Sequence, residues 1–289
     1  FKEAGPLFSY SIENFKAAEQ QGQMVSRPTL FARALHDPPA EWRCVEMESL
    51  CDFFSHPAGF LMQKRLCRIL EDMKILPDEK ENFQLEGLEK YRVEQALLRQ
   101  GMADLDLQAL RPLLNAAGIL PYGNVGAVAF NCLTPEVAHY VQKVRACFNR
   151  TVPKEIEFRE AIADFVICGT VRIAGDTMIH YRYVNQNPKE MIRLWIHHLA
   201  WCCSEKRRES LESIYIFRNA ALVYHYVANS RDLLEQLLTM FWEGLRRPIP
   251  FFPRTSHAYA EQTIERRKSK AEALRAARGK WVNAYYGRG

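Results

Sequence analysis

The chain has 289 residues, of which 48% are hydrophobic and 25% are charged, and its formal net charge is +5. These proportions are typical of a globular protein and exclude a disordered or fibrous chain. The sequence has no apolar run of bilayer-spanning length and no signal-peptide pattern, so we expect a cytoplasmic protein without a membrane contact. Because the first residue is Phe1 rather than Met, we expect a piece of a longer protein.

Eight cysteines are spread along the sequence without a C-x-x-C pair. Several fall within apolar helical patterns, where a free thiol behaves as a small hydrophobic side chain, so we expect reduced cysteines. His198 and Cys202 are spaced by four residues, a pattern that can bind zinc on one face of a helix. No second ligand pair follows them, and the sequence around them favours a packed helix.

By composition the chain divides into four segments. Residues 1–40 are punctuated by glycine and proline and predict an extended arm that links to a preceding domain. Residues 41–150 predict helices, residues 151–253 predict a sheet with helices, and residues 254–289 predict a basic C-terminal helix. We expect residues 41–289 to form one structural domain.

In the helical segment, apolar stripes predict two helices over residues 48–70. The break falls at His56-Pro57, and Ser49 is the expected N-cap of the first helix. Another helix is predicted over residues 84–100, with Gly101 just after its last residue.

The helical segment continues with a predicted helix over residues 104–117 that ends at Gly118. Residues 119–126 predict a turn. Thr134-Pro135 then predicts the start of a helix that runs to about residue 149, because proline is favoured in the first helical turn.

The stretch from residue 165 to residue 184 predicts a β-hairpin that turns at Ala174-Gly175-Asp176-Thr177. Strand periodicity assigns the side chains after the turn alternately to the two faces of the sheet. One face receives Met178, His180, Arg182 and Val184, and the other receives Ile179, Tyr181 and Tyr183.

After the hairpin, Asn187-Pro188 predicts a capped helix start, because an asparagine cap and a proline in the first turn are both favoured there. Residues 214–227 are rich in strand-forming residues. Ser230 is the expected cap of an amphipathic helix whose apolar residues recur at spacings of three and four. They are Leu233, Leu234, Leu237, Leu238, Phe241, Trp242 and Leu245.

The hairpin resembles that of RecB-type nucleases, which share the PD-(D/E)XK fold. In that family one strand carries G-x-I-D and the next carries D-Y-K, and the two carboxylates hold a divalent metal that activates water. Here the first strand has Gly169-Thr170-Val171-Arg172 and the second has His180-Tyr181-Arg182. The resemblance implies an α/β (α+β) fold, with a small mixed sheet flanked by helices and a helical N-terminal part.

The resemblance extends to residues 47–57, which are similar to the family's entry helix, and to residues 120–130. In the second segment the family has a metal-holding histidine where this chain has Phe130. The metal-site positions are therefore degenerate here: Phe130, Arg172 and His180 replace the expected ligands, and Arg182 keeps only the positive charge of the lysine. Because Mg²⁺ requires oxygen ligands, we expect no catalytic residues, no metal and no other cofactor.

Four phrases, in order, resemble the RecC family, the gamma subunits of exodeoxyribonuclease V. They are FQLEGLEKY (83–91), LPYGNVG (120–126), MIRLWIHHLAWCC (191–203) and KWVNAYYG (280–287). The resemblance implies a non-catalytic domain that scaffolds a heterotrimer with RecB-type and RecD-type subunits. It also implies DNA as a partner, with a role in guiding or splitting the duplex during double-strand break repair. We expect no small-molecule substrate.

Positive charge is concentrated at the C-terminus, where residues 254–289 carry nine Lys and Arg against three Glu. Such an excess is typical of a contact with nucleic acid, although a solvated helix face gives the same pattern. The candidate nucleic-acid-binding residues are Arg266, Arg267, Lys268, Lys270, Arg275, Arg278 and Lys280. Trp281, Tyr285 and Tyr286 are suited either to stack on bases or to pack on the domain.

Two other functions remain open at this stage. One is an active metal-dependent nuclease with relocated ligands, for which Asp164 is the candidate carboxylate. The other is a protein-docking module without DNA contact. Arg172, His180 and Arg182 would face a DNA strand in the first interpretation and would be ordinary sheet residues in the last.

Overall fold

A computed structural model describes residues 31, 33–68, 85, 87–148, 151–204 and 212–286, with side chains to residue 282. The chain divides into two compact units, Phe1–Leu35 and His36–Gly289. The predicted arm over residues 1–40 lies mostly outside the described residues. The second unit contains the sheet and the helices.

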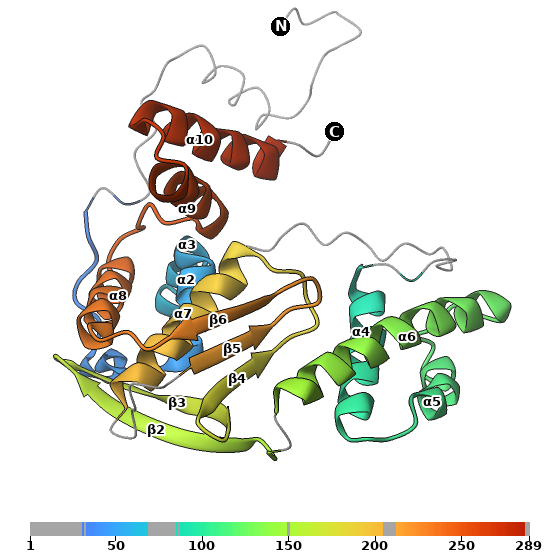
Figure 1. Cartoon of the computed structure of the whole chain (residues 1–289). Coiled ribbons are helices and arrows are strands. Elements are labelled where there is room, and N and C mark those ends of the chain that lie inside the picture. The colour runs from blue at the N-terminus through green and yellow to red at the C-terminus, as the bar shows by residue number, and fades with distance from the viewer. Residues whose placement is uncertain are drawn as a thin grey trace, which may run out of the picture. The chain divides into compact units, whose positions relative to one another are not determined.

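A six-stranded mixed sheet organises this unit, in the order β1-β3-β4-β5-β6 with β2 beside β3 (Figure 1). The strands are β1 (Cys44–Glu46), β2 (Lys154–Ile162), β3 (Phe165–Ala174), β4 (Thr177–Tyr181), β5 (Glu212–Ile216) and β6 (Ala221–His225). The pairs β1–β3 and β4–β5 are parallel, and the other pairs are antiparallel. The predicted mixed α/β architecture is confirmed.

The predicted hairpin is formed by β3 and β4, and its turn lies at the predicted residues. Gly175 has φ of +65°, a left-handed conformation that glycine adopts without strain. The two strands pair only beside the turn, at Ile173–Met178 and Ala174–Thr177. Farther from the turn they separate, and β1 pairs with the first half of β3 along Val166–Cys168. We call the opening between β3 and β4 the fork.

Helices cover both faces of the sheet. The larger apolar core lies between one face and helices α2, α7 and α8, and it includes Met178. A second core lies between the other face and helices α4, α5 and α6, and it includes Ile179 and Tyr183. Neighbouring residues of β4 therefore point into different cores, which confirms the alternation predicted for this strand.

The helical elements follow the sequence in order. They are η1 (Ala40–Arg43), α2 (Met47–Ser55), α3 (Pro57–Phe60), the π-helical turn η2 (Leu61–Arg65), α4 (Gly87–Met102), η3 (Leu107–Ala109), α5 (Leu110–Ala116), α6 (Asn124–Cys147), α7 (Pro188–Cys203), α8 (Ser230–Gly244), α9 (Pro253–Ala260), the π-helical turn η4 (Glu261–Glu265) and α10 (Lys270–Tyr286). Across the described residues, every helix is too short or too polar to cross a bilayer.

Several predicted boundaries are confirmed. Helix α2 ends before His56, and a new helix starts at Pro57. The Asn187 side chain caps α7 by accepting hydrogen bonds from the N–H groups of Lys189 and Glu190. Gly118 follows α5 with φ of +65°.

Other boundary predictions are wrong. Helix α6 begins at Asn124 and passes through Pro135, where a helix start was predicted. Proline cannot donate the interior hydrogen bond, but Thr134 Oγ1 donates to the Phe130 carbonyl at 2.8 Å within the same turn. Ser49 does not cap α2, because the N-cap is Glu46.

Gly101 also lies inside a helix rather than after it. A Cβ atom at this position would lie 2.8 Å from Val141 Cγ2, so the glycine permits close packing of α4 on α6. The single basic helix predicted over the C-terminal segment is in fact two helices, α9 and α10, with Arg267 in a left-handed conformation between them. In Figure 1 α10 folds back across α9.

Candidate functional site

The structure separates the four positions at which the sequence predicts a degenerate metal site. Phe130 is fully buried in the core beneath α6. Arg172 lies on the face of the sheet that carries Tyr181, with its guanidinium 5.2 Å from the Tyr181 ring centroid and 2.7 Å from Glu155 Oε1. His180 and Arg182 belong to the opposite face. A pair of ligands at positions 172 and 180 would therefore point away from each other.

His180 lies within a row of aromatic side chains on the α7 face. Its ring stacks on Tyr215 of β5 at a centroid distance of 4.7 Å and an angle of 10°. The ring of His197, from α7, meets it edge-on at 5.3 Å. Burial and the neighbouring His197 lower the pKa of His180 to about 3, so the imidazole is neutral at physiological pH.

Arg182 is held by an acid that the first turn of α7 supplies. Its Nη1 lies 2.6 Å from Glu190 Oε1, and the second carboxylate oxygen of Glu190 accepts a hydrogen bond of 2.9 Å from the buried Tyr215 hydroxyl. Both oxygens of Glu190 are thus engaged within the protein. The carboxylate acts as a structural acceptor, because each of its oxygens already meets a donor of the fold.

Helix α2 contributes a second group of charged side chains. Arg193 of α7 donates to Glu48 and, at 2.8 Å, to Asp52 Oδ1. His197 Nε2 lies 3.3 Å from Glu48 Oε1. The His197 side chain and the Arg193 guanidinium hold the pKa of Glu48 at about 2, so this carboxylate is ionised and paired.

These residues form one connected set, which we call the polar cluster: Glu48, Asp52, His180, Arg182, Glu190, Arg193, His197 and Tyr215. Its carboxylates point at arginine side chains, where a nuclease would require them to point at a metal. Among the described residues, no group of three or more His, Cys, Asp or Glu side chains is arranged to hold a metal ion. The donors present therefore do not fit a hard divalent cation.

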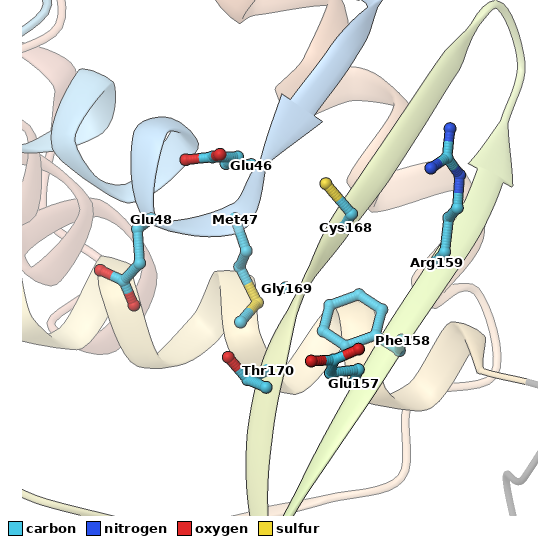
Figure 2. A pocket seen from close by; sticks show the side chains of 9 residues that line it. All are labelled: Glu46, Met47, Glu48, Glu157, Phe158, Arg159, Cys168, Gly169 and Thr170. Atoms are coloured by element: carbon cyan, nitrogen blue, oxygen red, sulfur yellow. The ribbon is translucent and has the colours of Figure 1, made fainter.

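Beside the fork is an open pocket of about 530 Å³, shown in Figure 2. Cys168, Gly169 and Thr170 of β3 lie between the β1–α2 corner and β2. A Cβ atom at Gly169 would lie 2.9 Å from Met47 Cβ, so the corner packs closely on the strand. The pocket contains the acids Glu46, Glu48 and Glu157, and Glu48 is the member shared with the polar cluster.

The other candidate ligands are placed elsewhere. Asp164 lies in the β2–β3 turn, at the opposite end of β3 from the hairpin turn, with its side chain 84% exposed and 3.7 Å from Arg43. His198 uses both ring nitrogens within the core, 2.7 Å from Ser213 Oγ and 2.8 Å from the His225 carbonyl. Neither arrangement supports a metal centre. All eight cysteines are present as thiols, as the sequence predicts.

Sequence reasoning missed the central members of the polar cluster. The sequence pattern marks Glu190 only as an acid in the first turn of a helix, and it gives Arg193 no particular role. A signal was present, because charged residues at these positions fall on the buried side of α7 and need partners there. The pairing of Arg193 depends on where α2 crosses α7, and the pairing of Glu190 depends on how α7 packs on the sheet. The local sequence specifies neither.

The predicted nucleic-acid-binding residues are divided between a turn and a helix. Arg266, Arg267 and Lys268 lie in the connection between η4 and α10, and Arg266 Nη2 is 2.6 Å from Glu261 Oε1. Lys270, Arg275, Arg278 and Lys280 lie on α10, and all seven side chains are exposed. Ala273 and Ala277 form the buried side of this helix.

Trp281 packs on Phe252 at a centroid distance of 4.4 Å. It also lines a pocket together with Phe252. The side chains of Tyr285 and Tyr286 lie outside the described residues. Trp281 therefore packs on the domain and also faces a pocket.

Comparison with known proteins gives one consistent result. The model of the RecC C-terminal domain family matches residues 42–264. The RecBCD enzyme subunit RecC of Escherichia coli (strain K12) is 28% identical over 98% of the chain, and the RecC subunit of Mycolicibacterium smegmatis is 24% identical over 85%. The RecC subunit of Haemophilus influenzae is 24% identical over 70%. The chain spans 20% to 25% of the length of these relatives.

Proposed function

Because the chain belongs to the RecC C-terminal domain family, we propose that it is a degenerate nuclease-like domain without catalytic activity. Its role is to scaffold a helicase–nuclease complex in the cytoplasm and to guide or split duplex DNA during double-strand break repair. The observation that carries the non-catalytic part is the polar cluster. Glu48 and Glu190, the acids that contact the neighbours of His180, are both neutralised by arginine side chains.

Pairing of this kind opposes metal binding for an electrostatic reason. An incoming Mg²⁺ would have to displace Arg182 from Glu190 or Arg193 from Glu48, and either step removes an ion pair from a partly buried guanidinium. We expect no Mg²⁺-dependent or Mn²⁺-dependent cleavage of single-stranded or duplex DNA by the purified chain.

A cleavage assay with both metals tests this part. The active-nuclease alternative requires measurable cleavage that Asp164→Ala abolishes. Cleavage that survives Asp164→Ala but disappears in Glu48→Gln would instead show that the polar cluster opens to a metal. Either result would overturn the non-catalytic assignment.

The DNA-handling part is supported by the exposed cations of the connection before α10 and of α10 itself. Phosphate neutralisation releases counterions, so affinity should fall steeply with salt. We expect a forked DNA to bind the chain, and we expect the triple change of Arg266, Arg267 and Lys268 to Gln to weaken binding. The slope of log affinity against log salt should become shallower by about 0.7–0.9 for each phosphate that the variant no longer neutralises.

Arg111→Gln is the matched control, because Arg111 is an exposed cation on α5. It should leave the affinity and the salt slope unchanged. Absence of forked-DNA binding at low salt would leave protein docking as the function of this domain.

Docking to partner subunits of the RecB and RecD type is supported by the helical part of the chain. Large apolar side chains are exposed there, and Tyr122 is 97% exposed. The set also includes Leu88, Tyr91, Leu105, Leu113, Val125 and Val128. Exposed apolar side chains gathered on one part of a protein are typical of protein contacts. Tyr122→Ser together with Val128→Ser should weaken assembly in pull-down with partner subunits without changing the thermal unfolding of the isolated chain.

A further inference from the structure

A second pocket, of about 310 Å³, lies where α3 and α7 begin and where α9 meets the end of α10. Twelve residues line it, and none of them is acidic. Three carry a permanent positive charge and come from three different helices: Lys189 from α7, Arg254 from α9 and Lys280 from α10. We call this cavity the basic pocket. Of its three cations, the sequence predicts a nucleic-acid contact only for Lys280.

Among the described residues, the three cations have no carboxylate partner. All three side chains are exposed, and within the described part of the chain none of them forms an ion pair. This contrasts with Arg145 and Arg218, each of which meets a carboxylate. Like charges gathered around one cavity repel one another, and an anion placed among them would relieve that repulsion.

The rest of the lining is mainly aromatic and apolar, with Ser55, His56 and Thr255 as its polar members. Trp281 and Phe252 meet edge to face, and Phe251 is anchored on Phe54 at a centroid distance of 5.5 Å. Trp281 is half-buried and follows Lys280 directly in the sequence, so one turn of α10 presents a cation and an indole together. An aromatic ring beside phosphate-binding cations is the arrangement that single-stranded nucleic-acid sites use for base stacking.

We propose that the basic pocket binds one nucleoside phosphate unit, with the phosphate among Lys189, Arg254 and Lys280 and the base against Trp281. The volume is at the small end of the range for ligand sites, which suits one nucleotide rather than several. Such a unit has two sources, a nucleotide of single-stranded DNA or a free nucleotide. The first source rests on the proposed DNA-handling function, and the second does not.

The test measures binding of thymidine monophosphate, inorganic phosphate and an eight-nucleotide oligothymidylate to the purified chain. The two small ligands are titrated by ligand-observed NMR and the oligonucleotide by fluorescence anisotropy. Lys280→Gln and Arg254→Gln should each weaken thymidine monophosphate binding at least threefold. Arg275→Gln removes the same charge from the exposed side of α10 outside the pocket, so it should leave mononucleotide binding unchanged.

Trp281→Leu separates the base contact from the phosphate contact. It should weaken thymidine monophosphate binding at least threefold and leave inorganic phosphate binding unaffected. Equal weakening for both ligands would contradict the base contact, and circular dichroism of the variant shows whether α10 has simply unfolded. Lys189→Gln tests the phosphate contact without touching α10, and it should weaken the binding of both ligands.

The outcomes distinguish this inference from the proposed function. If mononucleotide binding is absent or insensitive to Lys280→Gln and Arg254→Gln, the basic pocket is not a nucleotide site, even when forked DNA binds through Arg266, Arg267 and Lys268. If the mononucleotide binds through the pocket while DNA of any form does not bind, the pocket is confirmed with free nucleotide as its source, and the DNA-handling proposal fails.

Discussion

The polar cluster and the basic pocket differ in whether their cationic side chains meet carboxylates. In the polar cluster, Arg182 and Arg193 each meet a carboxylate within the fold. In the basic pocket, Lys189, Arg254 and Lys280 line one cavity without an acidic neighbour among its lining residues. Removing one partner of a charge pair inside a fold is costly, whereas cations gathered around a cavity attract an anionic ligand. The face of the sheet that carries His180 is thus the less promising place to look for a ligand.

The largest effect is expected from breaking the polar cluster at Glu190. Glu190→Ala removes the acceptor of both Arg182 and the buried Tyr215 hydroxyl. Unpaired buried donors of this kind cost about 2–4 kcal/mol of unfolding free energy. Urea unfolding followed by circular dichroism measures the decrease.

Two variants control this experiment. Glu190→Gln keeps an acceptor oxygen and should destabilise the chain less than Glu190→Ala. Glu212→Ala removes an acid whose partner, His225, is exposed, so it should cost about 1 kcal/mol or less. If Glu190→Ala costs no more than Glu212→Ala, the polar cluster does not stabilise the fold.

The next effect is a dependence of stability on pH. His180 has an ordinary pKa of 6.5 when unfolded and a pKa of about 3 in the fold, so the unfolded chain binds the proton first as pH falls. Stability from this group is therefore present above pH 6.5 and is lost as pH falls from 6.5 toward 3. The decrease in unfolding free energy between pH 7 and pH 5.5 should be about 1 kcal/mol.

Two other titratable groups, His198 and Glu48, also change the stability with pH, so their contributions must be separated from that of His180. Burial also lowers the pKa of His198, so part of the slope above pH 5 remains in His180→Phe. Glu48 has its pKa lowered from 4.5 to about 2, and its contribution is lost only below about pH 4.5. Unfolding curves at pH 7, 6.25 and 5.5 should therefore show a shallower slope in His180→Phe. An unchanged slope would contradict a His180 side chain that the fold keeps neutral.

A smaller effect tests whether Arg172 and Arg182 lie on opposite faces of the sheet. Arg172 forms an exposed ion pair with Glu155, so Arg172→Ala should cost about 0.5 kcal/mol. Arg182→Ala should lower the unfolding free energy more, because it removes the arginine partner of Glu190 on the buried face. Equal costs in parallel urea titrations would contradict the assignment of these residues to opposite faces.

The sequence predicted the elements whose signals are local. The cap at Asn187, the turn at Gly175 and the break at His56-Pro57 depend on residues within a few positions of one another, and each is found where expected. The helix through Pro135 was missed because tertiary packing of Phe130 and Val137 outweighs the local preference of proline for a helix start.

The candidate site was less predictable for a related reason. The residue types at positions 130, 172 and 180 are visible in the sequence, but the partners of Arg182 and Arg193 are not. Asp52 and Arg193 lie 141 residues apart and meet only because α2 packs on α7. The basic pocket likewise joins Lys189 to Lys280 across 91 positions, and no local pattern links them.

The smallest predicted effect is also the one that most directly tests the contrast between the two regions. If Lys280 is repelled by Lys189 and Arg254, Lys280→Gln should raise the unfolding free energy by about 0.3 kcal/mol at low ionic strength. The gain should disappear in about 1 M salt, where the screening length falls to about 3 Å. Arg275→Gln is the control, because Arg275 acts on Glu272 and its removal should not stabilise the chain. Thermal unfolding of both variants at the two salt concentrations measures the difference. A decrease in stability in Lys280→Gln at low salt would mean that the lysine has a favourable partner in the protein, and the basic pocket would then resemble the polar cluster after all.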